Sequence, residues 1–196
     1  MPDYLAARGR LRVREMAVHT AAAGLCAFLW AAYAETNLAH AVLLSFYALV
    51  LLLVTVTDLE HRLIPDKVML PAIGIAALAS PLRFGAGWPF AIAGGLVAWL
   101  FFASAYWLGE RFFGRGALGQ GDIKLGVFVG LISGFPQVLV ALVVALFAGG
   151  VTGMFLLVAR RATLRTAIPY GPFIVIGGFY AMVWGTEVVK WYARQF

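Results

Sequence analysis

Two aspartates, Asp58 and Asp122, are the side chains of this sequence best suited to catalysis. Asp58 ends an apolar segment in LLLVTVTDLEHRLIPD, and Asp122 begins another in GALGQGDIKLGVFVG. The chain has only nine acidic residues, and it places these two at helix borders, where a carboxylate facing a helix bundle is costly and functional by default. Two facing carboxylates can share a proton, so that one acts as base and the other as acid. The pair therefore predicts acid–base chemistry.

The composition predicts an all-α, polytopic membrane helix bundle. The chain of 196 residues is 63% hydrophobic and 12% charged, about half the charged fraction of a soluble domain. Apolar segments predict six or seven transmembrane helices, of which the third and fifth are short. They cover 16–34, 39–57, 67–82, 88–108, 123–134, 136–159 and 172–192. We expect a basic segment over residues 1–15 and one membrane-embedded domain over 16–196.

The basic residues predict the orientation of these helices. All of the fifteen lysines and arginines fall on one side of the predicted bundle except Arg83, Lys190 and Arg194. By the positive-inside rule, the amino terminus is cytoplasmic, and both aspartates lie at the cytoplasmic face. The net charge of +6 is then a topology signal with some attraction to anionic lipids, which argues against nucleic-acid binding. With one cysteine and no CxxC or Cys/His cluster, we expect neither a metal nor another cofactor.

The helix ends favour different roles for the two aspartates. Asp122 is expected at a helix amino end, which favours the anion and the role of base, whereas Asp58 is expected at a carboxyl end and is the candidate acid. The dipole contributes about 0.3–1 kcal/mol to each, so it biases this assignment without deciding it. Position alone leaves a structural interpretation equally open, in which both residues cap helices or pair with Arg62, Lys67 or Lys124.

Glycines around Asp122 predict a close helix contact. Asp122, Gly126, Gly130 and Gly134 recur every four residues and form one stripe of a helix. Such a stripe lets a second helix approach and would turn Asp122 into the interface, although glycines that merely pack a bundle predict the same stripe. Gly119 and Gly121 would allow backbone turns closed to other residues, or belong to an ordinary loop.

Three stretches together resemble the type IV prepilin peptidases, the related preflagellin peptidases and, more distantly, the GxGD membrane proteases. The stretches are DLEHRLIPD (58–66), GQGDIKL (119–125) and IPYGPFI (168–174), and they occur in the family's order. The resemblance implies a membrane aspartyl endopeptidase with Asp58 and Asp122 as catalytic pair. It implies prepilin or pseudopilin substrates whose leaders are cut at the cytoplasmic face of the inner membrane.

Other residues of these stretches are candidates for supporting roles. Glu60 and Asp66 are candidates for binding the basic leader, tuning the pair or capping a helix, and Glu60 lies off the helix face of Asp58. Lys124 either holds Asp122 ionised or marks the membrane interface. Pro65 is expected to fix the entry to the third segment. The remaining candidates shape or border the site: Gly119, Gln120, Gly121, Pro169, Gly171 and Pro172.

The sequence departs from the family's pattern in two respects. Bifunctional members resemble a longer design with paired CxxC motifs and an N-methyltransferase activity, so we expect peptidase activity alone here. Gln120 stands where the family more often has a small or apolar residue, which leaves substrate preference open. A proton- or cation-coupled transporter and a noncatalytic secretion-apparatus scaffold are the alternative functions. Acids at one membrane face, without evident repeated halves, speak against transport.

Overall fold

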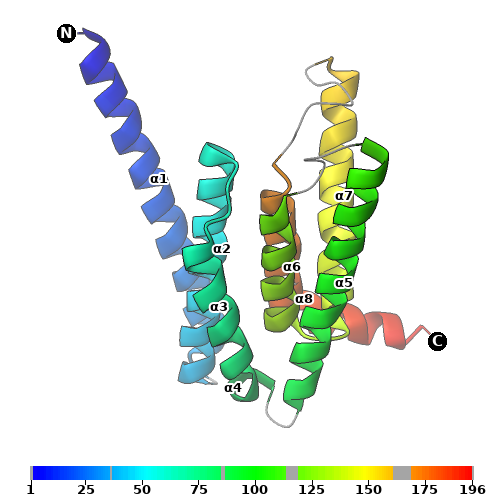
Figure 1. Ribbon diagram of the computed structural model, residues 1–196. Helices are drawn as coiled ribbons and strands as arrows, with labels where there is room; N and C mark the ends of the chain where they lie inside the picture. Colours follow the sequence, from blue (N-terminus) through cyan, green and yellow to red (C-terminus); the bar gives the residue numbers. More distant parts are fainter. Residues whose placement is uncertain (1, 36, 85–86, 114–118, 161–168, 196) are drawn as a thin grey trace. The chain divides into compact units, whose positions relative to one another are not determined.

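The structure is a computed structural model that describes residues 2–35, 37–84, 87–113, 119–160 and 169–195. Arg115, Arg161 and Arg165 of the charge pattern, and Ile168 of the third motif, lie outside these ranges. The described residues form helices and no strand, as the sequence predicts (Figure 1). The helices are α1 (Pro2–Tyr33), α2 (Leu38–His61), α3 (Asp66–Leu78), α4 (Ser80–Phe84), α5 (Trp88–Phe113), α6 (Gln120–Ser133), α7 (Gln137–Val158) and α8 (Gly171–Ala193).

Every predicted apolar segment is helical, but the helices differ in length. Five stretches within α1, α2, α5, α7 and α8 are long and apolar enough to cross a membrane. Helices α3 and α6 have only 13 and 14 residues, fewer than the roughly 20 that span a bilayer core. The end of the third predicted segment forms the separate short helix α4. Asp122 therefore lies outside the helical stretches that are long enough to span a membrane.

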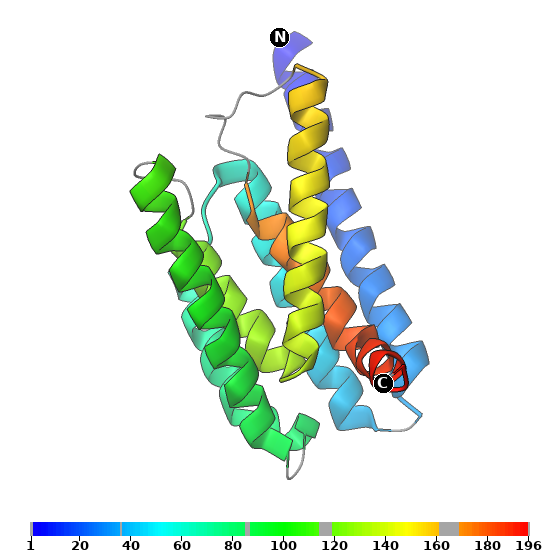
Figure 2. The same ribbon diagram turned by 90° about the vertical axis from the view of Figure 1, so that its right-hand side faces the viewer.

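The chain forms two compact units, Met1–Leu52 and Leu53–Phe196. The first unit holds α1 and the larger part of α2. The second holds the end of α2 and helices α3 to α8, and so contains both candidate aspartates. Within the second unit, α5 packs along α6 and α7 along α8, as Figures 1 and 2 show. Helix α6 also contacts α3 and α8, which makes this short helix the centre of the unit.

The glycine stripe of α6 faces α5, which confirms the predicted close helix contact. The ring of Phe102 on α5 lies directly against Gly126, where a Cβ atom would collide with it. A Cβ at Gly130 would lie 2.7 Å from the carbonyl carbon of Gly94, so only two glycines allow the backbones this close. Gly134 ends the helix with a φ of 75°, a left-handed conformation that glycine adopts freely.

Candidate active site

Asp58 lies in the last turn of α2 and is held by the first residue of α8. Its side chain is buried, with 6% of the residue exposed. The backbone N–H of Gly171 donates a hydrogen bond to Asp58 Oδ2 over 3.1 Å. A Cβ at Gly171 would collide with that oxygen and lie 3.0 Å from Asp58 Cγ. The absence of a side chain at Gly171 is therefore what allows α8 to begin against the carboxylate.

Asp122 lies in the first turn of α6 and is 8% exposed. Its Oδ2 accepts a hydrogen bond from the N–H of Gly119 over 3.0 Å, while its own N–H donates to the carbonyl oxygen of Gly119 over 3.1 Å. This reciprocal arrangement caps the helix, and the positive helix end stabilises the carboxylate form. The capping role that the sequence left open is thus present, and it leaves one carboxylate oxygen, Oδ1, outside the cap.

Neither glycine before Asp122 has unusual torsion angles, so the interpretation based on special turns was wrong, and the structure instead needs Gly121 for space. Gly119 has φ −79° and ψ 144°, which is ordinary extended backbone, and Gly121 lies inside α6. A Cβ at Gly121 would lie 2.8 Å from the Cβ of Ile64, a buried residue of the α2–α3 connection. Gly121 therefore lets the segment that follows Asp58 pack against the helix that carries Asp122.

The environment of Asp122 raises the pKa of its carboxyl toward neutral pH. Burial raises the pKa of Asp122 to about 6, the hydrogen bond from Gly119 opposes this rise, and the negative charge of Asp58 adds to it. The two carboxylates are therefore close enough to repel each other. Among the residues that the structure describes, neither has a cationic partner, so the site holds two buried acids that backbone N–H groups contact.

Lys124 pairs with Asp66 and not with Asp122. Its Nζ lies 2.6 Å from Asp66 Oδ1, and this ion pair joins the amino-terminal part of α6 to the first turn of α3. Asp66 is mostly exposed, with 59% of its side chain accessible, so the pair is a surface contact. The lysine nearest to Asp122 in the sequence thus forms its ion pair with a different carboxylate, that of Asp66.

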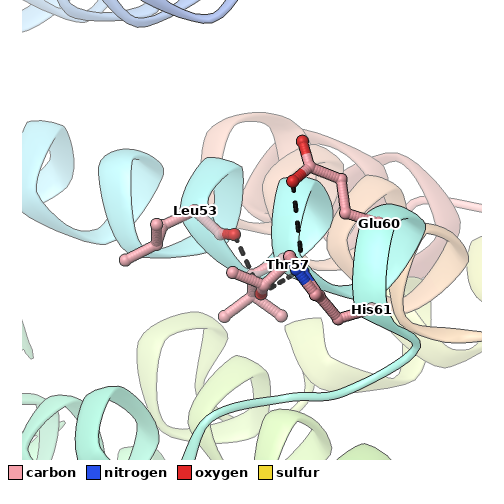
Figure 3. A network of polar contacts seen from close by, with 5 residues as sticks. Leu53, Thr57, Glu60 and His61 are labelled. Atoms are coloured by element: carbon pink, nitrogen blue, oxygen red, sulfur yellow. Dashed lines mark hydrogen bonds and ion pairs between the residues drawn. The ribbon is translucent and has the colours of Figure 1, made fainter.

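Glu60 lies at the end of α2 beside His61. Figure 3 shows the two side chains, whose Glu60 Oε2 and His61 Nδ1 atoms are 4.0 Å apart. The same view shows the hydroxyl of Thr57 donating to the carbonyl oxygen of Leu53 within the helix. Because α2 stays helical to His61, Glu60 and Asp58, two residues apart, point to different helix faces. This geometry matches the expectation that Glu60 lies off the face of Asp58.

The remaining candidates flank the helix starts. Pro65 is the residue before α3, and its carbonyl oxygen accepts the first hydrogen bonds of that helix, as expected for the entry to this segment. Gln120 is the first residue of α6 and is exposed. Pro169 and Pro172 are half-buried on either side of the start of α8.

Sequence reasoning missed two residues at this site, Ile64 and Tyr170. Ile64 fills the space beside Gly121, and Tyr170 precedes the glycine that binds Asp58. Both lie inside the quoted motifs, and that position was the only available signal. Across the described residues, no three His, Cys, Asp or Glu side chains gather as a metal site requires.

Comparisons with known proteins identify a family and relatives for this chain. A family model described as "Type IV leader peptidase family" matches residues 45–154. The curated relatives include proteins named "Prepilin leader peptidase/N-methyltransferase" from Pseudomonas putida, Aeromonas hydrophila and Legionella pneumophila. These are 30%, 30% and 31% identical over 70%, 75% and 69% of this chain and 48%, 51% and 47% of theirs. The chain spans about half the length of these relatives. No solved structure matches significantly.

Proposed function

The chain belongs to the type IV leader peptidase family, and from that premise we propose that it is an aspartyl endopeptidase of prepilins or pseudopilins. It is a multi-pass membrane protein by its apolar helices and its family. We propose that it lies in the inner membrane, as the resemblance to prepilin peptidases implies, with the amino terminus and the site toward the cytoplasm, as the basic residues predict. The proposal covers leader cleavage alone.

One observation carries the proposal: Asp58 and Asp122 are both buried, each is held by a backbone N–H, and the charge of one acts on the other. A backbone N–H holds a carboxylate in place without adding a full positive charge. Such a charge would lower the pKa of the carboxyl and keep it ionised. Such a pair can therefore hold one proton between two acids, which is the requirement of aspartyl proteolysis.

The proposed reaction assigns one proton transfer to each aspartate. The Asp122 carboxylate accepts a proton from water, and the hydroxide that forms attacks the carbonyl carbon of the scissile peptide bond. Protonated Asp58 donates its proton to the carbonyl oxygen or to the leaving amine, so that the C–N bond breaks to give an acid and an amine. The helix start at Asp122 favours its role as the base.

Supporting residues have proposed roles beside this chemistry. Gly171 and Gly119 hold the two carboxylates, and Gly121 makes room for Ile64. Asp66 and Lys124 join α3 to α6 next to the site. Glu60 and the exposed Gln120 lie at helix ends where they can meet the substrate's leader, and Pro65, Pro169 and Pro172 shape the connections.

The test is cleavage of a co-expressed prepilin in membranes by wild type, Asp58→Asn and Asp122→Asn. Each substitution keeps the side chain's size and removes the acid. Both variants should accumulate in the membrane and leave the leader uncut. Glu187→Gln, at an exposed position of α8, is the matched control and should cleave as wild type does. Normal cleavage by either aspartate variant would end the two-acid mechanism, and a wild type that cuts no pilin-like substrate would favour transport or a scaffold role.

A further inference from the structure

We propose that the aromatic ring of Tyr170 holds the two candidate carboxylates in their working arrangement, acting as a positioning residue and not as a catalytic one. This inference deepens the proposed peptidase function and rests on it. It follows from three sets of contacts, which connect Tyr170 to the Asp58 side of the site, to three helices around its ring, and to the Asp122 side.

The backbone of Tyr170 controls the hydrogen bond to Asp58. Tyr170 is the residue immediately before Gly171, whose N–H binds Asp58 Oδ2 over 3.1 Å. The carbonyl oxygen of Tyr170 accepts hydrogen bonds from the N–H groups of Phe173 and Ile174, at 3.1 and 3.3 Å, and so starts α8. Gly171 has no side chain of its own to anchor it, so the position of its N–H depends on what holds Tyr170.

The ring of Tyr170 is held by α5, α7 and α8. Its centroid lies 6.4 Å from that of Phe102 on α5, in an edge-on geometry, and 5.9 Å from that of Phe173 on α8. Both distances fall in the range of favourable aromatic pairs. On the α7 side, a Cβ at Gly149 would lie 2.7 Å from Tyr170 Cε2, so the ring occupies the space that this glycine leaves open.

Phe102 carries the connection to Asp122. This ring is almost fully buried and lies directly against Gly126, one helical turn after Asp122 on the same stripe of α6. The ring of Tyr170 therefore lies against the side chain that fixes how closely α5 and α6 approach beside Asp122. Independently, burial and then the charge of Asp122 raise the pKa of the Tyr170 hydroxyl, which puts that hydroxyl in the field of Asp122.

Two substitutions of Tyr170 separate the role of the ring from that of the hydroxyl. Tyr170→Phe keeps every ring contact and removes only the hydroxyl, so it should cleave a prepilin at close to the wild-type rate. Tyr170→Leu removes the ring and should lower kcat by about tenfold to a hundredfold, since misplacing a reacting group by about 1 Å costs up to about that factor. KM should change much less, because the proposed function assigns the leader contacts to other residues, Glu60 and Gln120.

Two neighbouring glycines of α7 provide a matched pair that leaves Tyr170 itself intact. Gly149→Ala puts a methyl group against the ring and should lower kcat in the same direction as Tyr170→Leu. Gly150→Ala, whose Cβ would meet nothing within 4 Å, should leave kcat unchanged. This pair also decides the matter if Tyr170→Leu fails to accumulate, because equal kcat for the two alanine variants would overturn the inference.

An infrared titration of the Asp122 carboxyl band separates this inference from the proposed function, because it needs no substrate. The band is assigned as the one lost in Asp122→Asn. Loss of the ring in Tyr170→Leu should admit water and lower the pKa of Asp122 toward its ordinary value, and Tyr170→Phe should not. If Tyr170→Leu shows this shift but the wild type cleaves no prepilin, only the proposed function is contradicted. An unchanged band, or Tyr170→Phe as impaired in kcat as Tyr170→Leu, would overturn the inference.

Discussion

Replacing Gly171 with alanine should displace the Asp58 carboxylate and abolish most of the activity. The new Cβ would collide with Oδ2 and lie 3.0 Å from Cγ and 3.4 Å from the Cβ of Asp58. To reach ordinary contact the carboxylate must retreat by about 1 Å, a displacement that can cost a hundredfold in rate. The hydrogen bond, now 3.1 Å, would then exceed the length at which it counts as one. As Asp58 gives up its proton it becomes a carboxylate, and losing a hydrogen bond to a charged group costs about 1.5–3 kcal/mol, or about tenfold to a hundredfold, so both routes agree.

The assay is leader cleavage by the purified enzyme, with kcat and KM measured separately for Gly171→Ala and wild type. The loss should appear in kcat, because the substitution moves a reacting group and adds nothing to the exposed helix ends. Gly74→Ala is the control, since a Cβ there would meet nothing within 4 Å, and it should behave as wild type. A Gly171→Ala enzyme with unchanged kcat would show that Asp58 does not need this contact and would refute the reasoning.

Two further predictions concern the Asp122 side of the site. Because a carboxyl with a pKa of about 6 is ionised above that value, an Asp122 base makes kcat/KM rise with pH through about 6. In the proposed reaction the profile falls again only at the higher pH where Asp58 loses the proton that it donates, and a profile that falls through pH about 6 without this rise would contradict the base role of Asp122. Gly121→Ala should reduce cleavage far more than Gly119→Ala, since its Cβ would lie 2.8 Å from Ile64 Cβ while that of Gly119 would lie 3.3 Å from Asp122 Oδ2. Cleavage by the two alanine variants in membranes checks this order, and the reverse order would contradict it.

The sequence predicted the helices and the stripe because both follow from local periodicity. Apolar segments predicted every long helix, and the four-residue repeat of glycines correctly predicted a close contact with a second helix, which the structure shows to be α5. The same repeat turned Asp122 inward, where the structure finds it buried. These features repeat within single helices, where successive members of the pattern lie about one turn apart, so no knowledge of the tertiary fold was needed.

The partners of the acids could not be predicted, because they come from distant parts of the chain. Asp58 binds the N–H of Gly171, 113 residues away, and Lys124 pairs with Asp66, 58 residues away. A backbone N–H has no sequence signature. The position of Lys124 two residues after Asp122 suggested Asp122 as its partner, whereas Lys124 pairs with Asp66. Gly121 was similarly misread, because the sequence shows the missing side chain and not the Ile64 that needs its space.

Holding the acids with backbone groups has a chemical consequence that a cationic partner would remove. A lysine or arginine beside either carboxylate would favour its ionised form and lower its pKa, and an acid fixed as the anion cannot donate a proton. The chain carries fifteen lysines and arginines, yet the one two residues from Asp122 is directed to the exposed Asp66. Burial and mutual repulsion then raise the pKa of Asp122 while the Gly119 N–H still holds it in place. In the proposed two-acid hydrolysis, this arrangement would let a proton move between the two acids and the substrate.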